Sequence, residues 1–192
     1  MSKVMNPAIS ELLEGNQRFT AGNSRHKCYS IDEIESLSTA QVPLAAVVAC
    51  SDSRVAPEVV FDQPLGKLFV SRVPGNVASD SAKWMIDIAV GEFKVPLLIV
   101  MGHTGCLAVQ QVYQGKDGPG GILRYQVQTA VLETKSMNVD DPLTAAIENN
   151  TRHTVRRLQD ESSALRDAIQ DRKIEVVGAL YDMTTGQIRI LD

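Results

Sequence analysis

Two short segments of this chain carry side chains that can bind a metal ion. Cys50 ends one apolar run, and His103 and Cys106 follow a second apolar run. Two thiolates and one imidazole form a soft ligand set of the kind that Zn²⁺ prefers. Three protein ligands leave a fourth position for water or substrate, as in catalytic zinc sites. The residue types therefore predict one zinc ion per chain, bound by Cys50, His103 and Cys106.

Two charged residues follow the first of these predicted ligands. Asp52 and Arg54 can form an ion pair, and beside a metal ion they can handle a proton or an anion. An isolated Asp–Arg pair is more often a structural ion pair or part of a turn. Because this pair stands next to a predicted metal ligand, we interpret it as functional.

The composition excludes several classes of protein. The 192 residues can form one good-sized core, and a hydrophobic fraction of 44% is typical of a soluble globular domain, expected to span residues 1–192. The net charge of −4 argues against nonspecific nucleic-acid binding, and no apolar run reaches the length of about 18 residues that a membrane span needs. Three cysteines argue against a disulfide framework and favour a cytoplasmic protein. Cys28 is interpreted as a spare thiol.

Five segments that could hold these residues in place have the composition of strands: 44–50, 67–73, 95–101, 174–180 and a short one at 187–191. The near-continuous apolar run at 44–50 is typical of a strand that is buried on both faces of a parallel sheet. Helical patterns alternate with these strands. The sequence therefore predicts an α/β fold with a mostly parallel sheet of about five strands flanked by helices.

The first 40 residues are predicted to form an N-terminal helical arm. Asn6 and Pro7 have the types expected at the cap and first turn of a helix, which should end near Gly22. Ser30 and Glu33 form a capping-box pattern for a short helix at 31–37. Further helical patterns cover 81–93, with Trp84 and Ile88 predicted on one face, 107–137 with a break at 115–121, and 141–165, which can form one helix or two.

The predicted topology brings the two metal-binding segments together. Ligands of open α/β sheets bind beyond the carboxyl ends of the strands. Cys50 and His103 both lie at or just past such an end, so the fold would place them at one edge of the sheet although they are distant in sequence.

The pattern Cys-x-Asp-x-Arg followed by a later His-x-x-Cys resembles the β-class carbonic anhydrases. The resemblance covers most of the chain and includes the segments 14–19, 50–55, 72–76, 102–106 and 176–182. It implies that Cys50, His103 and Cys106 are zinc ligands and that Asp52 and Arg54 form a catalytic dyad. The implied reaction is the reversible hydration of CO2 to bicarbonate and a proton.

The resemblance also implies substrate-binding residues. Gln41, nine residues before Cys50, matches a glutamine that donates to bound bicarbonate in one subgroup, and Phe69 matches an aromatic residue of the same pocket. Gly75 is interpreted as a turn residue first and as part of the site second. The family typically pairs its chains so that the sites lie at the subunit boundary, so Gln41 and Phe69 are expected to serve the zinc of a partner chain.

A homodimer or homotetramer is expected for a second reason. The N-terminal arm around Leu12, Leu13 and Phe19 is more apolar than a free extension should be.

The chain also departs from the family at some positions. Val47 replaces a tryptophan that another subgroup uses in an inhibitory bicarbonate site, so such a site is not expected here. Ile88, Leu107 and Pro74 alter the predicted pocket wall rather than the metal ligands.

The chemistry that these residues can perform is consistent with this resemblance. Zinc lowers the pKa of a bound water from about 15.7 toward about 7, which makes a nucleophile available at neutral pH. Asp52 can accept a hydrogen bond from that nucleophile, and Arg54 can hold Asp52 ionised and away from the metal. Two thiolate ligands favour activity at alkaline pH. Two alternatives remain: hydrolysis of carbonyl sulfide or carbon disulfide at the same site, and a non-catalytic protein that binds zinc or bicarbonate.

Overall fold

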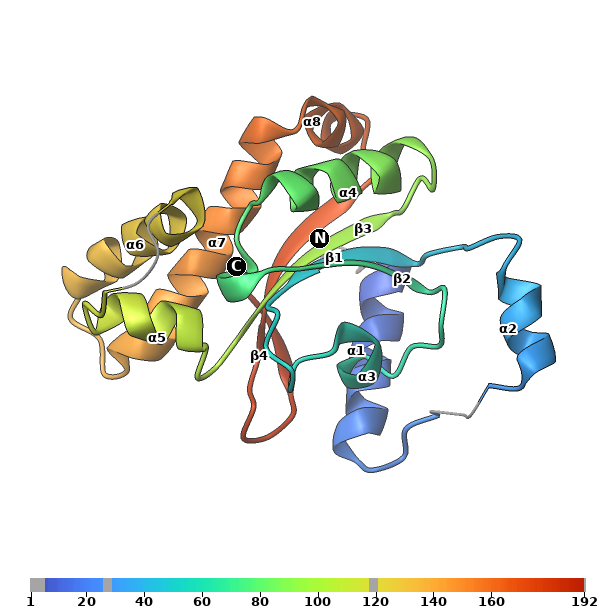
Figure 1. The fold of residues 1–192 in the computed structure, drawn as a ribbon, viewed down its shortest axis with the longest axis horizontal. Helices are drawn as coiled ribbons and strands as arrows, with labels where there is room; N and C mark the ends of the chain where they lie inside the picture. Colours follow the sequence, from blue (N-terminus) through green and yellow to red (C-terminus); the bar gives the residue numbers. More distant parts are fainter. Residues whose placement is uncertain (1–5, 26–28, 118–120, 192) are drawn as a thin grey trace, which may run out of the picture.

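A five-stranded sheet forms the centre of the protein (Figure 1). The computed structural model describes residues 6–25, 29–117 and 121–191, so Cys28 and part of the predicted break at 115–121 lie outside it. The strands are β1 (Ala45–Ala49), β2 (Leu68–Arg72), β3 (Leu97–His103), β4 (Glu175–Tyr181) and β5 (Ile188–Leu191). Their order is β2-β1-β3-β4-β5, and only β5 runs antiparallel to its neighbour. The predicted fold class is confirmed.

Helices cover both faces of the sheet, which explains the apolar runs. All five residues of β1 are buried, and alternate positions belong to opposite apolar clusters. On one face, α1 (Pro7–Thr20) and α3 (Pro57–Val60) pack against the strands. On the other face lie α4 (Asp80–Gly91), α8 (Ser163–Gln170) and part of α7 (Pro142–Glu161).

A third apolar cluster lies beyond the carboxyl ends of the strands. It is formed largely by α5 (Leu107–Tyr113), α6 (Ile122–Lys135) and α7, which gather at one end of the molecule in Figure 1. Cys50 and Cys106 both belong to this cluster. The two predicted thiolate ligands therefore sit in a water-poor environment built by helices that follow β3 in the chain.

Helix α1 begins as the sequence predicts. The Asn6 side chain accepts a hydrogen bond from the amide of Ala8, and Pro7 occupies the first turn. Within the helix, Asn16 is buried and donates to the carbonyl oxygens of Val60 and Gly186. These bonds tie α1 to α3 and to the β4–β5 hairpin of the same chain.

The description of residues 1–40 as one helical arm needs correction. Leu12 is fully buried against the sheet, because α1 covers one face of its own chain. The apolar residues of α1 therefore give no evidence for a homodimer or homotetramer. In contrast, α2 (Ile31–Leu37), which has the predicted capping box, buries none of its residues and stands away from the sheet in Figure 1.

Other helices differ from the prediction in detail. Trp84 is 71% exposed, and the buried face of α4 consists of Ala82, Met85, Ile86 and Ala89. The prediction that Trp84 lies on the apolar face was wrong, because Trp84 lies outside the face that packs against the sheet. The pattern at 141–165 forms two helices, because Ser162 caps a new helix, α8. The helical region ends at Gln170, beyond the predicted end at residue 165.

Two short elements were not predicted as helices: α3, for which there was no signal, and the 3₁₀ turn η1 (Pro74–Asn76), where Gly75 was interpreted only as a turn residue. They are too short to produce a periodic apolar pattern. Among the helices that the structure describes, none combines the length and apolarity needed to cross a membrane.

Candidate metal centre

The three predicted ligands meet where the direction of the chain connections reverses. Strands β1 and β3 are neighbours, but the chain leaves β1 toward β2 and leaves β3 toward β4. Such a switch point opens a crevice at the carboxyl ends of the strands. Cys50 directly follows β1, His103 ends β3, and Cys106 directly precedes α5. The sheet topology thus places the two sequence motifs side by side.

The donor atoms of Cys50, His103 and Cys106 have the spacing of a metal site. All three residues are buried, and their donor atoms lie within 4.8 Å of one another. The two Sγ atoms are 3.9 Å apart. Tetrahedral Zn²⁺ with Zn–S bonds of about 2.3 Å would separate two sulfurs by about 3.8 Å. The side chains therefore fit zinc without rearrangement of the thiols.

The His103 ring is held with one nitrogen free. Its Nδ1 lies 3.0 Å from the carbonyl oxygen of Thr104 and 3.1 Å from Sδ of Met183. Its Nε2 is buried and has no hydrogen-bond partner. With the proton on Nδ1 and donated to Thr104, Nε2 carries the lone pair that a metal needs. A buried nitrogen without a partner is costly in a protein, and a metal ion at this point would remove that cost.

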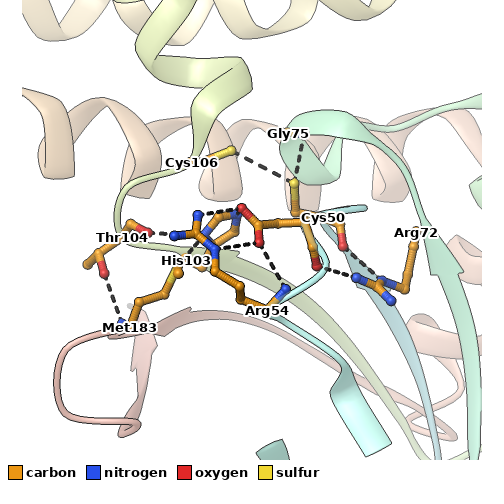
Figure 2. A network of polar contacts seen from close by, with 9 residues as sticks. Cys50, Arg54, Arg72, Gly75, His103, Thr104, Cys106 and Met183 are labelled. Carbon is orange, nitrogen blue, oxygen red and sulfur yellow. Dashed lines mark hydrogen bonds and ion pairs between the residues drawn. The ribbon is translucent and has the colours of Figure 1, made fainter.

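The loop of Met183 is itself fixed to the His103 segment. The amide of Met183 donates to Oγ1 of Thr104, as Figure 2 shows, and the amide of Thr104 donates to the carbonyl oxygen of Tyr181. The end of β3 is therefore tied to the β4–β5 hairpin, which restricts how the His103 ring can turn.

The two thiols differ in their affinity for protons. The neighbouring Cys106 thiol lowers the pKa of Cys50, with further lowering by His103 and by the backbone amides of Asp52 and Gly75. Pairing with Cys50 and burial raise the pKa of Cys106. Cys50 therefore loses its proton more readily than Cys106. A coordinating thiol is deprotonated outright, so a bound cation would also remove the proton of Cys106.

Asp52 and Arg54 form a bidentate ion pair beside the three ligands. Arg54 donates from Nε at 2.9 Å and from Nη2 at 2.8 Å to the two carboxylate oxygens, and its backbone amide adds a third bond at 3.0 Å. These hydrogen bonds hold the pKa of Asp52 far below its ordinary value. One Asp52 oxygen lies 4.0 Å from Nε2 of His103. An ionised acceptor is therefore held next to the predicted metal position.

Arg72 is a feature of the site that the sequence motifs contain but did not explain. From the end of β2, its guanidinium donates to the carbonyl oxygens of Cys50, at 2.9 Å, and of Asp52 (Figure 2). These two carbonyls flank the start of the loop that carries the dyad. Arg72 therefore fixes the backbone between a predicted metal ligand and the predicted catalytic carboxylate.

Gly75 contacts a predicted metal ligand through its backbone, and its expected part in substrate binding stays a prediction. Its amide donates to Sγ of Cys50 at 3.4 Å, as the dashed line in Figure 2 marks. Its φ of +72° falls in the left-handed region that favours glycine. A Cβ atom here would lie 3.2 Å from Cγ2 of Val127, a tight contact that a larger residue could make only if Val127 moved.

Gln41 and Phe69 do not join the cluster of their own chain. Gln41 precedes β1, whereas Cys50 follows it, so the length of the strand, about 16 Å, separates them. Phe69 pairs in register with Ala46 near the start of β1 and stacks edge-on against Phe93 with ring centroids 5.1 Å apart. Both residues lie toward the amino end of the strands. Their expected role in the site of a partner chain stays a prediction.

Comparisons with known proteins agree with this geometry. Residues 45–188 match the family model described as carbonic anhydrase. The chain is 37% identical over 191 residues to carbonic anhydrase 2 of Mycobacterium tuberculosis, which covers 96% of this chain and 92% of that protein. It is 35% identical over 189 residues to the carbonic anhydrase of Mycolicibacterium smegmatis, covering 95% and 91% of the two chains.

A solved structure shows the same fold. It belongs to the study of two tetrameric β-carbonic anhydrases from Sordaria macrospora, and it matches with a TM-score of 0.73 and 22% identity over 97% of this chain and 98% of that chain. The matched residues 45–188 span Cys50, His103 and Cys106, which the structure brings together. The chain therefore belongs to the β-class carbonic anhydrases, a family of carbonate dehydratases.

Proposed function

We propose that this protein catalyses the reversible hydration of CO2 to bicarbonate and a proton, with one zinc ion held by Cys50, His103 and Cys106. The observation that carries the proposal is the buried Nε2 of His103, which has no protein partner and faces two thiols at the spacing of a tetrahedral ion. Membership of the carbonic anhydrase family supports the same reaction.

The dyad supplies the group that orients the attacking water. Zinc, when bound, supplies the Lewis acidity that makes a water nucleophilic near neutral pH. Asp52 is an acceptor only, because a carboxyl group is ionised at neutral pH and the bidentate bond from Arg54 lowers its pKa further. A water that donates one hydrogen to Asp52 has its lone pair turned away from the carboxylate and toward an incoming CO2. Asp52 therefore acts as the orienting acceptor, and Arg54 holds it in place.

The same pair can control access to the metal. Asp52 lies close enough to the three ligands to enter the fourth position if Arg54 releases it. In the structure Arg54 makes three bonds to Asp52, an arrangement that supports the open form of the site. We propose that release by Arg54 closes the site and that the bidentate pair keeps it open.

A second copy of the chain is proposed to complete the substrate pocket. Gln41 lines a hollow of about 660 Å³ together with Ile34, Leu37, Leu65 and Phe93, on the face that carries α2. Ile31 at the start of α2 is 75% exposed, and a seven-residue helix with no buried side chain is not stable by itself. A second copy would cover this apolar surface and receive Gln41 in its site. The Sordaria enzymes are described as tetrameric, which supports a homodimer or homotetramer here.

The free thiols of Cys50 and Cys106 favour a reducing compartment. We therefore propose a cytoplasmic location, and a small molecule rather than a nucleic acid as the substrate, in keeping with the net charge of −4.

The test is a stopped-flow assay of CO2 hydration on purified protein whose zinc content is measured in parallel. We expect about one zinc per chain and an activity that is lost with the metal. Carbonyl sulfide and carbon disulfide are assayed on the same sample. Hydrolysis of either without CO2 hydration would overturn the proposed substrate. Bound zinc with no turnover of any of the three would indicate a non-catalytic zinc or bicarbonate protein.

A further inference from the structure

A buried amide side chain lies directly beneath the turn that contacts Cys50. Asn150 is in the middle of α7 and is only 1% exposed. Its Nδ2 donates to the carbonyl oxygen of Gly75 at 2.7 Å. Gly75 in turn donates its amide to Sγ of Cys50 at 3.4 Å. A chain of two hydrogen bonds therefore links the core of α7 to a predicted metal ligand.

The turn needs this support because its backbone is unusual. Gly75 and Asn76 both have positive φ angles, 72° and 44°. For a residue with a side chain, such as Asn76, this conformation is uncommon and persists only where the surroundings hold it. Asn76 also donates from Nδ2 to Oγ1 of Thr151 at 3.4 Å, so two neighbouring residues of α7 bind the turn.

The N–H and the carbonyl of Gly75 belong to two consecutive peptide groups that meet at the Gly75 Cα. Asn150 anchors the second group, and Thr151 accepts from the Asn76 side chain, so α7 restrains the turn directly after the N–H that meets Cys50. A side chain at position 75 would be strained, because φ is +72° and a Cβ would lie only 3.2 Å from Cγ2 of Val127. Asn150 therefore holds the turn from α7, at the carbonyl of Gly75.

We propose that Asn150 is a positioning residue for the metal centre, which acts through the Gly75 backbone to keep a hydrogen bond on the Cys50 sulfur. An N–H donated to a thiolate sulfur withdraws charge from it and fixes the direction of its lone pairs. The inference rests on the proposed metal site and extends it to a residue that no motif contains. Loss of a group that orients a metal ligand costs about 10–100-fold in metal affinity. Because Asn150 acts through one intervening residue, we expect the lower end, about tenfold.

The experiment compares Asn150→Leu with Asn149→Leu. Leucine is close in size to asparagine and removes the donor without adding charge. Asn149 is the matched control, because it is the adjacent residue of α7 and its amide donates elsewhere, to Oγ1 of Thr134 at 2.8 Å. Zinc affinity is measured by competition with a chelator. The thiolate-to-metal charge-transfer band is recorded after substitution with Co²⁺.

Asn150→Leu should bind zinc about tenfold more weakly and shift the cobalt charge-transfer band, while Asn149→Leu should match the wild type in both. A merely structural role would lower the melting temperature without moving that band. If Asn150→Leu does not fold, the pair Asn150→Ala and Asn149→Ala replaces it.

Tight zinc binding and an unchanged band in the folded Asn150 variant would overturn this inference and leave the proposed function intact. A wild-type protein that binds neither zinc nor cobalt would overturn the metal site itself and the inference with it.

Discussion

The two ends of the parallel strands differ in how far one chain completes them. At the carboxyl end, Cys50, His103 and Cys106 are buried. Hydrogen bonds donated by Arg72 and Gly75, and one accepted by the carbonyl oxygen of Thr104, fix the segments around them. At the amino end, Gln41 and the neighbouring α2 are exposed around an apolar hollow.

This difference separates two tasks of the proposed enzyme. Metal ligands need positions held to a fraction of an ångström, which only a well-packed interior provides. The contact with bicarbonate that is expected of Gln41 needs a surface that meets another surface. One chain therefore builds the metal site by itself, and we expect that only a second copy brings the substrate-binding residues to it. Three experiments test this division.

Removal of a metal ligand at the carboxyl end should have the largest effect. Cys106→Ser replaces a soft sulfur ligand by a hydroxyl that binds zinc poorly, so the variant should lose its zinc and essentially all CO2 hydration. Cys28→Ser, at the predicted spare thiol, is the control and should keep both. Zinc content and stopped-flow rates provide the measurement. Full zinc content in Cys106→Ser would remove Cys106 from the ligand set.

Loss of the dyad partner should have the next largest effect. Arg54→Ala leaves the three ligands in place, so zinc should stay bound while the rate falls about 10²-fold, within the range for loss of a positioned proton-handling group. Asp52→Asn should lower the rate similarly. Its neutral amide side chain should not close the site, because it has no carboxylate to occupy the fourth metal position.

The pH dependence of Arg54→Ala follows from the sign of the Asp52 shift. Arg54 lowers the pKa of Asp52, so its removal lets that pKa rise toward the ordinary value of about 3.9. Asp52 is then still ionised at neutral pH, and raising the pH from 7 to 9 should not restore the deficit relative to wild type. Rates against pH for both proteins check this. A deficit that disappears at high pH would mean that Arg54 acts by keeping Asp52 ionised, rather than by holding its position.

The amino end should give the smallest effect, and one that depends on assembly. Gln41→Ala should lower the rate about tenfold, as expected for the loss of one hydrogen bond to a charged substrate. When Gln41→Ala and Cys106→Ser chains are mixed and reassembled, a mixed dimer holds one chain of each variant. In one of its two sites, the intact metal ligands of the Gln41→Ala chain meet the intact Gln41 of the Cys106→Ser chain. One complete site per mixed dimer should then return, about a quarter of all sites in a random mixture.

Two controls sharpen this experiment. Each variant reassembled alone should show no recovery, and sedimentation should confirm that the chains are dimeric or larger. If mixing restores nothing although mixed assemblies form, Gln41 serves the zinc of its own chain or none, and the proposed division of tasks fails.

Local sequence was sufficient for much of this protein. All five strands lie close to where the apolar runs predicted them. The N-cap of α1 at Asn6 and the capping box of α2 at Ser30 were also predicted. These features depend on neighbours a few residues away, so a single sequence contains them. The three residues that the structure brings together as candidate metal ligands could also be predicted from the sequence, because Cys and His are metal-binding residue types and stand at the ends of predicted strands.

Tertiary structure alone decided how those ligands are supported and what remains open to a partner. Arg72 and Asn150 reach backbone atoms of distant segments, and nothing in their own surroundings in the sequence marks those contacts. The exposure of Trp84 and the burial of α1 depended likewise on which neighbour each helix found. The physical reason is that hydrogen bonds and close packing are made between surfaces that only the folded chain brings together, whereas residue type and period are fixed along the chain itself.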